Sequence, residues 1–260
     1  MSATDPHQAP RLAIVAALQE EVSHILEHMQ SKRCELVAGR SFWTATYHEH
    51  PVVVVLSGIG KVAAAITATT LIERFGVKEI LFTGVAGSLD TGVLVGDVVI
   101  GSHFIQHDMD ASPLFARYLV PGYDEMSFKS NVQLSKRLKL ASSKVLENLE
   151  RYVSEEIVSK FKLTRPRMHS GLVLSGDQFV SNDALRESLK ESHPLALVVE
   201  MEGAALAQVC QDYGIDFCLM RTVSDGAGEH AAKDFTAFLH EVASRYSALI
   251  VRAYLDINDR

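Results

Sequence analysis

The sequence lacks the features that mark membrane-spanning, disulfide-linked and zinc-binding proteins. No apolar run approaches the roughly 20 residues that a helix needs to cross a bilayer. The three cysteines, Cys34, Cys210 and Cys218, lie in apolar segments without CxxC spacing, so we expect reduced thiols in the core. HExxH motifs and Cys/His ladders are also missing from the sequence, so we expect no metal and no cofactor.

Basic residues are outnumbered by acidic ones. Lys and Arg number 25 against 32 Asp and Glu, and the resulting net charge of −7 argues against nucleic acid as the main partner. The N-terminus, MSATDPHQAPR, has neither the basic start nor the apolar stretch of a signal peptide. We therefore expect a frayed tail over residues 1–10, one folded domain over residues 11–260, no membrane partner and a cytoplasmic location.

Short apolar runs alternate with helical patterns along the chain. The runs are continuous rather than alternating at every second residue, which is typical of strands covered on both faces. This pattern predicts an α/β fold with a central mixed β-sheet and helices on both faces. We also expect a long irregular connection at 107–128 and a pair of surface helices at 130–162. Strands are expected at 11–18, 34–40, 41–48, 51–58, 79–84, 97–106, 168–176, 195–200 and 215–224, and further helices at 19–29, 62–75, 183–192, 203–214 and 237–255.

Acidic residues follow several of the predicted strands. In open α/β folds, ligands bind beyond the carboxyl ends of the strands, so residues at these positions are expected to share one site. Only Lys61 and Arg221 are cationic among them. A pocket of this kind suits a neutral or cationic ligand, or a transition state that becomes positive. The acids at the strand ends are Glu20, Glu21, Asp177, Glu200, Glu202 and Asp225.

Simpler interpretations exist for some of these features. Glu20 suits the first turn of a helix, where the helix dipole favours acids. Asp225 could cap a turn, and Glu202 could cap the helix that follows it. The segment SGIGKVAA nearly matches the GxGxxG fingerprint, but it lies far from the first strand and no acid ends a following strand at the expected spacing, so we expect no NAD. These interpretations leave unexplained why several acids fall at one end of one sheet.

Eight short motifs connect these segments with a known family. In chain order they are AALQEEV, SGIGKVAAAI, TGVAGSL, VGDVV, HD, SGDQFV, VEMEGAALA and RTVSD. Together they resemble the purine/uridine phosphorylase superfamily, and within it the 5′-methylthioadenosine/S-adenosylhomocysteine nucleosidases. The resemblance runs from about residue 11 to 255, and the pair VEMEGAA and RTVSD is its most specific part. It implies hydrolysis of the N-glycosidic bond of 5′-thio-substituted adenine nucleosides.

The resemblance implies a role for each matching residue. Asp225 resembles the general acid that protonates N7 of adenine, which requires a carboxyl kept protonated by burial. Glu21 resembles the residue that activates the attacking water, and Glu202 the acceptor of the ribose hydroxyls. Carboxylates beside the sugar stabilise the positive charge that develops as the bond breaks. The remaining site residues are Val85 and Gly87 at the ribose, Met201 against the sugar, Phe179 stacked on adenine, Val180 at its edge, Phe235 at the 5′ substituent, Ser224 to orient the acid, Arg221 to brace the network and Glu200 to assist with the water.

Three other functions remain as alternatives. Phosphorolysis needs a phosphate dianion, normally held by arginine, and Glu21 stands where that branch binds phosphate. This favours hydrolysis, although Arg40 could be argued for phosphate. Futalosine-type nucleosides are alternative substrates, because the chain departs from its relatives at Val85, at Leu18 and in the longer segment 107–167, whose counterpart in the family helps close the 5′ end of the pocket. A nucleoside-binding protein without turnover is disfavoured, because binding does not require both an acid and a base.

The resemblance also implies a homodimer. In the family, the region that corresponds to 107–128 packs against the partner subunit, so we expect this connection at or near the interface. His107 and Asp108, which open it, are expected to be structural or to face the dimer rather than to be catalytic.

Overall fold

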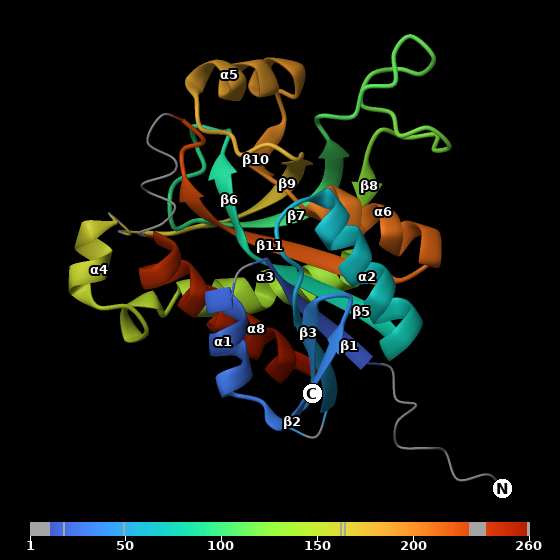
Figure 1. Cartoon of the computed structure of the whole chain (residues 1–260). Coiled ribbons are helices and arrows are strands. Elements are labelled where there is room, and N and C mark those ends of the chain that lie inside the picture. Colours follow the sequence, from blue (N-terminus) through green and yellow to red (C-terminus); the bar gives the residue numbers. More distant parts are fainter. Residues whose placement is uncertain are drawn as a thin grey trace, which may run out of the picture.

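The computed structural model describes residues 11–17, 19–48, 50–161, 163, 165–228 and 238–258 (Figure 1). The strands are β1 (Arg11–Ala16), β2 (Gln30–Val37), β3 (Arg40–Tyr47), β4 (His50–Leu56), β5 (Val77–Thr83), β6 (Val85–Ser88), β7 (Val98–Gln106), β8 (Phe128–Lys129), β9 (Met168–Ser175), β10 (Ala196–Glu200) and β11 (Asp216–Asp225). The helices are α1 (Gln19–Glu27), α2 (Lys61–Phe75), α3 (Val132–Leu146), α4 (Glu155–Lys160), α5 (Asp183–Ser192), α6 (Gly203–Tyr213) and α8 (Ser244–Asn258), with a 3-10 turn η2 (Leu149–Arg151) and a π-helical segment η3 (Leu239–Ala243).

The strands form one mixed sheet. Its order is β2-β3-β4-β1-β5-β11-β6-β10-β9-β7-β8. β1 runs parallel to both of its neighbours, β4 and β5, whereas β3 is antiparallel to β2 and β4. The central strands carry continuous apolar runs because both faces of the sheet are covered, and residues 52–55 of β4 are all buried. The predicted α/β fold with a mixed sheet is confirmed.

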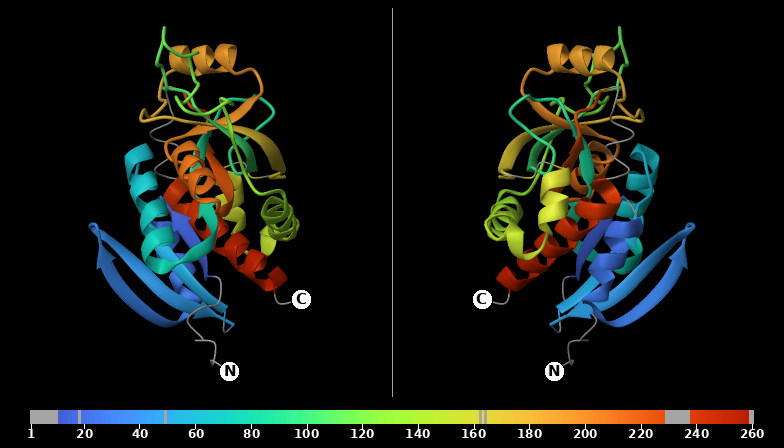
Figure 2. Two further views of the ribbon diagram at one scale, coloured as in Figure 1. Left: turned by 90° about the vertical axis from the view of Figure 1, so that its right-hand side faces the viewer. Right: turned by 90° about the vertical axis from the view of Figure 1, so that its left-hand side faces the viewer.

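Helices cover both faces of this sheet (Figure 2). On one face, α1, α3 and α8 pack over a core that includes Ile14 of β1. On the other face, α2 and α6 pack over a second core that includes Val15, the next residue of the same strand. Successive side chains of a strand point to opposite faces, so one apolar run supplies both cores. A smaller third core lies beneath α5, at the top of Figure 1, and contains Leu189.

β11 organises the half of the sheet where the acids converge. Its beginning pairs with β5, its end pairs with β6, and it also pairs with β7. The pairings β6–β10, β10–β9 and β9–β7 complete a closed circuit of strands. Within this circuit, Gly87 of β6 is the register partner of both Val199 and Asp225. One residue therefore separates the ends of β10 and β11, where Glu200 and Asp225 stand.

Two expectations from the sequence are wrong, those for β6 and for Cys34. β6 lies in a segment predicted to be a loop, because VAGS contains glycine and serine and lacks an apolar run. α3 lies on the surface as predicted: Leu138 and Ala141 face the core, whereas Val132 and Leu140 are 65% and 51% exposed. Cys34 is not a core thiol: it is exposed on β2, one of the two edge strands, whereas Cys210 and Cys218 are buried as expected.

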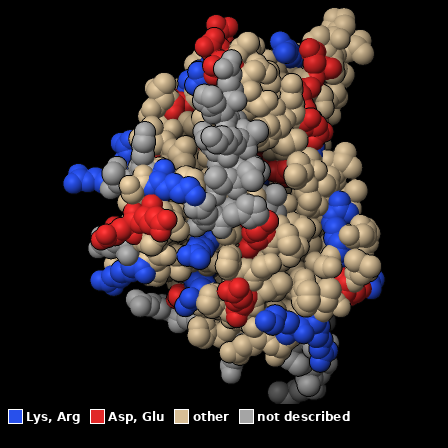
Figure 3. All heavy atoms as spheres, turned by 60° about the vertical axis from the view of Figure 1, so that its left-hand side comes forward, with Lys and Arg blue, Asp and Glu red and all other residues tan. Residues whose placement is uncertain are grey.

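The surface carries both signs of charge. On the face that Figure 3 shows, the Lys and Arg side chains of the described residues are interspersed with Asp and Glu. Within the described part of the chain, no helix is both long enough and apolar enough to cross a membrane. The predicted tail over 1–10, Leu18 of the first predicted strand and Ala237 of the last predicted helix lie outside the described residues.

Candidate active site

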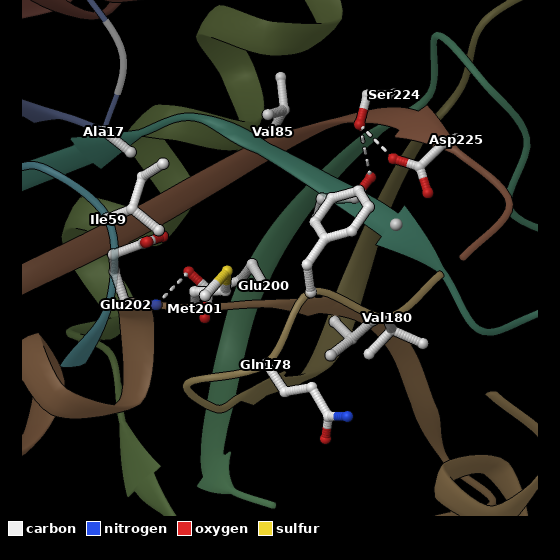
Figure 4. A pocket seen from close by; sticks show the side chains of 14 residues that line it. Ala17, Ile59, Val85, Gln178, Val180, Glu200, Met201, Glu202, Ser224 and Asp225 are labelled. Carbon is white, nitrogen blue, oxygen red and sulfur yellow. Dashed lines mark hydrogen bonds between the residues drawn. The ribbon is translucent and has the colours of Figure 1, made fainter. Parts of the chain in front are cut away.

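A cavity of about 290 Å³ lies at the ends of several strands (Figure 4). Segments that follow β1, β4, β9 and β10 contribute to its wall, together with β6 and the end of β11. Most of the lining is apolar, with a few polar groups, which is typical of small-molecule sites. The lining residues are Ala17, Ile59, Val85, Ala86, Gly87, Gln178, Phe179, Val180, Val199, Glu200, Met201, Glu202, Ser224 and Asp225.

Glu200, the last residue of β10, is held in a dense network. The guanidinium of Arg221 donates to its Oε2 through Nη2 at 2.5 Å and Nε at 3.2 Å. The hydroxyl of Ser175 and the backbone N–H of Gly203 also donate to this carboxylate. A buried charge is tolerated when it is paired and hydrogen-bonded in this way. Glu200 therefore acts as an anchor for Arg221 and for the start of α6.

Arg221 itself is fully buried on β11. Its guanidinium lies 4.2 Å from the ring centroid of Phe82, and its Nη2 is 3.7 Å from Oε2 of Glu202. Gly84 makes room for it, because a Cβ at that position would stand 2.9 Å from Nη1. The predicted bracing role of Arg221 thus takes the form of one cation between two carboxylates, Glu200 and Glu202.

Glu202 stands at the junction of β10 and α6. Its Oε1 accepts a 2.9 Å hydrogen bond from the backbone N–H of Gly60, and the side chain is almost fully buried. Burial and the neighbouring carboxylate of Glu200 raise the pKa of Glu202 from 4.5 to about 7, against the opposing effect of Arg221. A positive charge placed in the cavity would favour the ionised form of this side chain.

Asp225 ends β11 on another wall of the cavity (Figure 4). The hydroxyl of Ser224 donates to its Oδ2 at 2.7 Å, and the N–H of Ala227 donates to its Oδ1 at 2.8 Å. Ala227 has a φ of 50°, in the left-handed region that non-glycine residues seldom adopt. Gly87 is required beside this carboxyl, because a Cβ there would stand 2.9 Å from Oδ1. The predicted pairing of Ser224 with Asp225 is present.

Phe179 and Val180 line the cavity after β9. The Phe179 side chain is 42% exposed, although it belongs to the lining, so its ring can meet a planar ligand. Val180 is buried beside it. Met201, Val85 and Gly87 also lie in the lining, as predicted for the sugar side.

Among the predicted site residues that the structure describes, Arg221 and Glu21 are not part of this lining. Glu21 is fully buried in the first turn of α1, and its Oε1 accepts a 2.9 Å hydrogen bond from the hydroxyl of Ser247 on α8. From this part of the chain, Ala17, just before α1, lines the cavity and Glu21 does not. The role of Glu21 stays a prediction. Phe235 lies outside the described residues.

Some contributors were not singled out from the sequence. Ser175 donates to Glu200 and accepts the N–H of Ala204, and the N–H of Gly60 reaches Glu202. Both residues lie in motifs, SGDQFV and SGIGK, but their partners are distant in the chain. Ser247 lies in the C-terminal helix, where no motif marks it.

Carboxylates on different walls of a mostly apolar cavity make this cavity the candidate active site of an enzyme. The model of the phosphorylase superfamily matches residues 11–256, and the chain therefore belongs to that superfamily. It is 33% identical over 241 residues to the 5′-methylthioadenosine/S-adenosylhomocysteine nucleosidase of Oceanobacillus iheyensis, covering 92% of this chain and 96% of that protein.

Solved structures agree with this assignment. The futalosine hydrolase of Helicobacter pylori matches with a TM-score of 0.84 and 30% identity, over 96% of this chain and 99% of that one. A mutant of the 5′-methylthioadenosine/S-adenosylhomocysteine nucleosidase of Helicobacter pylori, with 5′-methylthioadenosine in its active site, matches with a TM-score of 0.82 and 29% identity, over 96% and 100%. The chain therefore shares its fold over almost its whole length with purine nucleosidases.

Proposed function

We propose that the protein hydrolyses the N-glycosidic bond of 5′-methylthioadenosine and S-adenosylhomocysteine, releasing adenine and the thio-ribose. The observation that carries this proposal is the placement of Asp225 and Glu202 on different walls of one cavity that also presents the ring of Phe179. The substrates named for the relatives support it. Such an enzyme would serve methionine salvage.

Asp225 is the acid of the proposed mechanism. As the bond between C1′ and N9 breaks, its electron pair passes to the purine, and the carboxyl proton of Asp225 moves to N7, so adenine leaves as a neutral molecule. The hydrogen bonds from Ser224 and Ala227 fix the orientation of the carboxyl before the reaction begins. Phe179 stacks on the base, and the backbone of Val180 reads its edge.

The other carboxylates act on the sugar and the water. Glu202 accepts hydrogen bonds from the ribose hydroxyls, and Met201 packs against the sugar. The cationic sugar of the transition state favours ionised Glu202, so the interaction is stronger in the transition state than in the ground state. Glu21 takes a proton from the water that adds to C1′. Arg221 and Glu200 hold the framework, and Phe235 contacts the 5′ substituent.

The helix N-termini near the cavity argue for water rather than phosphate as the nucleophile. Such N-termini commonly bind phosphate, but here their N–H groups already have partners within the chain. The N–H groups of Gly60 and Lys61 at α2 donate to Glu202 and Asp177, and that of Gly203 at α6 donates to Glu200. Arg40, the candidate phosphate ligand, donates to backbone oxygens through Nε and Nη1.

We also propose a homodimer formed by the start of α2 and the 107–128 connection. Val62 and Ile66 share one side of α2 at helical spacing and are 70% and 39% exposed, and Ile59, just before the helix, is 61% exposed. Leu114 and Phe115 are exposed on the connection. An apolar surface of this kind favours association with a partner. The free state of the three cysteines supports a cytoplasmic location.

An adenine-release assay tests the catalytic proposal. The substrates are methylthioadenosine, adenosylhomocysteine, a futalosine-type nucleoside and inosine, each with and without phosphate. We expect release of adenine from the first two at the same rate in both conditions. Strict dependence on phosphate would identify a phosphorylase, and a strong preference for the futalosine-type compound would reassign the substrate. Binding of adenine without any release would identify a nucleoside-binding protein.

A further inference from the structure

Three charged side chains join the loops around the cavity: Lys61, Asp108 and Asp177, here called the Lys61 cluster. The ammonium of Lys61 lies 2.6 Å from Oδ1 of Asp108 and 3.2 Å from Oε1 of Gln106. The other oxygen of Asp108 accepts the backbone N–H of Asp177 at 2.8 Å. Oδ1 of Asp177 accepts the backbone N–H of Lys61 at 2.7 Å. These bonds close a ring that links the segments following β4, β7 and β9.

One side of this cluster leads directly to Glu202. Gly60, the residue before Lys61, donates its N–H to Oε1 of Glu202 at 2.9 Å. Gly60 has a φ of 97°, and a Cβ there would stand 3.0 Å from Oδ1 of Asp177. The backbone at Gly60 is therefore held between the carboxylates of Asp177 and Glu202. The position of Lys61 determines the direction in which the N–H of Gly60 points.

The other side of the cluster leads to Phe179. Asp177 stands two residues before this aromatic ring, and the intervening Gln178 also lines the cavity. Beneath the same segment, the buried ring of His107 contacts Gly176 so closely that a Cβ there would stand 2.3 Å from Nε2. His107 therefore supports the segment that carries Phe179 through its contact with Gly176, and Asp108 supports it through the hydrogen bond from Asp177.

The charges of the cluster stabilise one another. Burial opposes ionisation of Asp108, but the hydrogen bonds from Lys61 and from the N–H of Asp177 lower the pKa of this carboxyl below its usual value. The side chains of Lys61 and Asp108 are 18% and 30% exposed, so water screens their ion pair less than it would a pair on the open surface.

None of the three charged side chains belongs to the described lining of the cavity. We propose that Lys61, Asp108 and Asp177 are positioning residues of the reaction, which set the ribose-binding carboxylate of Glu202 and the base-stacking ring of Phe179 at a fixed separation. This inference rests on the proposed nucleosidase function and extends it to residues outside the cavity. The ring of hydrogen bonds transmits a displacement on either side to the other.

The test compares Lys61→Met with two controls. Lys61→Arg keeps a cation opposite Asp108. Lys190→Met removes a comparable ion pair, that of Lys190 with Asp90 at 2.8 Å and 31% and 35% exposure, from residues that do not line the cavity. The measurements are kcat and KM for adenine release, the Kd of adenine, hydrogen exchange of residues 176–180, and Tm.

We expect Lys61→Met to lower kcat/KM and to weaken adenine binding by about tenfold each, with faster exchange at residues 176–180 and a Tm close to that of the wild type. Lys61→Arg and Lys190→Met should match the wild type. Asp108→Asn should reproduce the effect of Lys61→Met, and the double variant should be no worse than the poorer single variant, because the two residues act as a unit.

Each failure has a separate signature. A wild-type protein that releases no adenine contradicts the proposed function, whereas the hydrogen-exchange comparison still reports on the loop. A functional wild type with unchanged adenine Kd and exchange in Lys61→Met overturns the positioning role. A lower Tm with a reduced fraction of binding-competent protein, but an unchanged Kd, also overturns it, because that result describes a merely structural pair.

Discussion

At the scale of single residues, Asp225 offers the most direct test of the chemistry. Asp225→Asn keeps the size of the side chain and an oxygen for one of its two hydrogen-bond donors, but removes the acidic proton. We expect kcat to fall by about 10²–10⁴-fold in the adenine-release assay, which is the usual contribution of a general acid. The Tm should change little. A near-normal rate would remove Asp225 from its proposed role.

Glu21 tests the water-activating step. Its carboxylate is fully buried and accepts a hydrogen bond from Ser247. Glu21→Gln retains an oxygen for that bond but cannot take a proton from water, so we expect turnover to fall at least about 100-fold with adenine affinity unchanged. Ser247→Ala is the companion variant, and a smaller loss is expected because the base itself remains. Full activity in Glu21→Gln would assign the water to another group.

Protonation of Glu202 makes the stability of the folded protein depend on pH. Because the pKa of this carboxyl in the folded protein is about 7, above its ordinary 4.5, the folded state binds the proton more tightly than the unfolded state. The resulting stabilisation is complete below about pH 4.5 and is lost as the pH rises through 7. Glu202→Gln abolishes this loss, so at pH 8 we expect its Tm to exceed that of the wild type by about 6 °C.

The comparison needs the full pH range and a neutral control. The advantage of Glu202→Gln should disappear below about pH 4, where the wild-type carboxyl is mostly protonated in both states. Glu187→Gln, at an exposed position on α5, should leave the Tm profile unchanged. Equal Tm values of wild type and Glu202→Gln at pH 8 would mean that the buried carboxylate costs the fold nothing.

At the scale of elements, the close approach of β6 and β11 can be probed through Gly87. An alanine there would place its Cβ 2.9 Å from both Oδ1 of Asp225 and the Cβ of Ala227. We expect Gly87→Ala to displace the acid and to lower kcat about tenfold or more. Gly226→Ala is a matched control, because a Cβ at that position meets nothing within 4 Å. Equal kcat values for Gly87→Ala and Gly226→Ala would show that the close approach of β6 and β11 is not needed for turnover.

The elements also show how far the sequence is informative. Continuous apolar runs such as residues 52–55 predict the buried strands correctly, because a short run of β-branched residues suits a strand covered on both faces. β6 is missed because its four residues have neither a run nor an alternation. Of the six acids expected at the ends of strands, three line the cavity (Glu200, Glu202 and Asp225) and three do not (Glu20, Glu21 and Asp177). The contacts of Glu21 with Ser247 and of Glu202 with Gly60 could not be predicted, because they depend on how elements distant in the chain pack.

At the scale of the whole molecule, the exposed apolar side of α2 tests the proposed dimer. Val62→Asp places a charge in the centre of that surface, where burial against a partner would leave it unpaired. We expect light scattering to report the mass of a dimer for the wild type and that of a monomer for Val62→Asp. Val132→Asp, at a similarly exposed valine on α3, should remain dimeric. A monomeric wild type would contradict the dimer.

The exposed position of Cys34 makes the native chain ready for site-selective labelling. Burial raises the pKa of the other two thiols, Cys210 and Cys218, and that of Cys218 reaches about 12, so neither competes for an alkylating reagent at neutral pH. β2, which carries Cys34, contributes no residue to the described wall of the cavity. A maleimide dye would therefore label the wild-type protein at Cys34 alone, away from the described wall of the cavity. Turnover of single labelled molecules could then be observed.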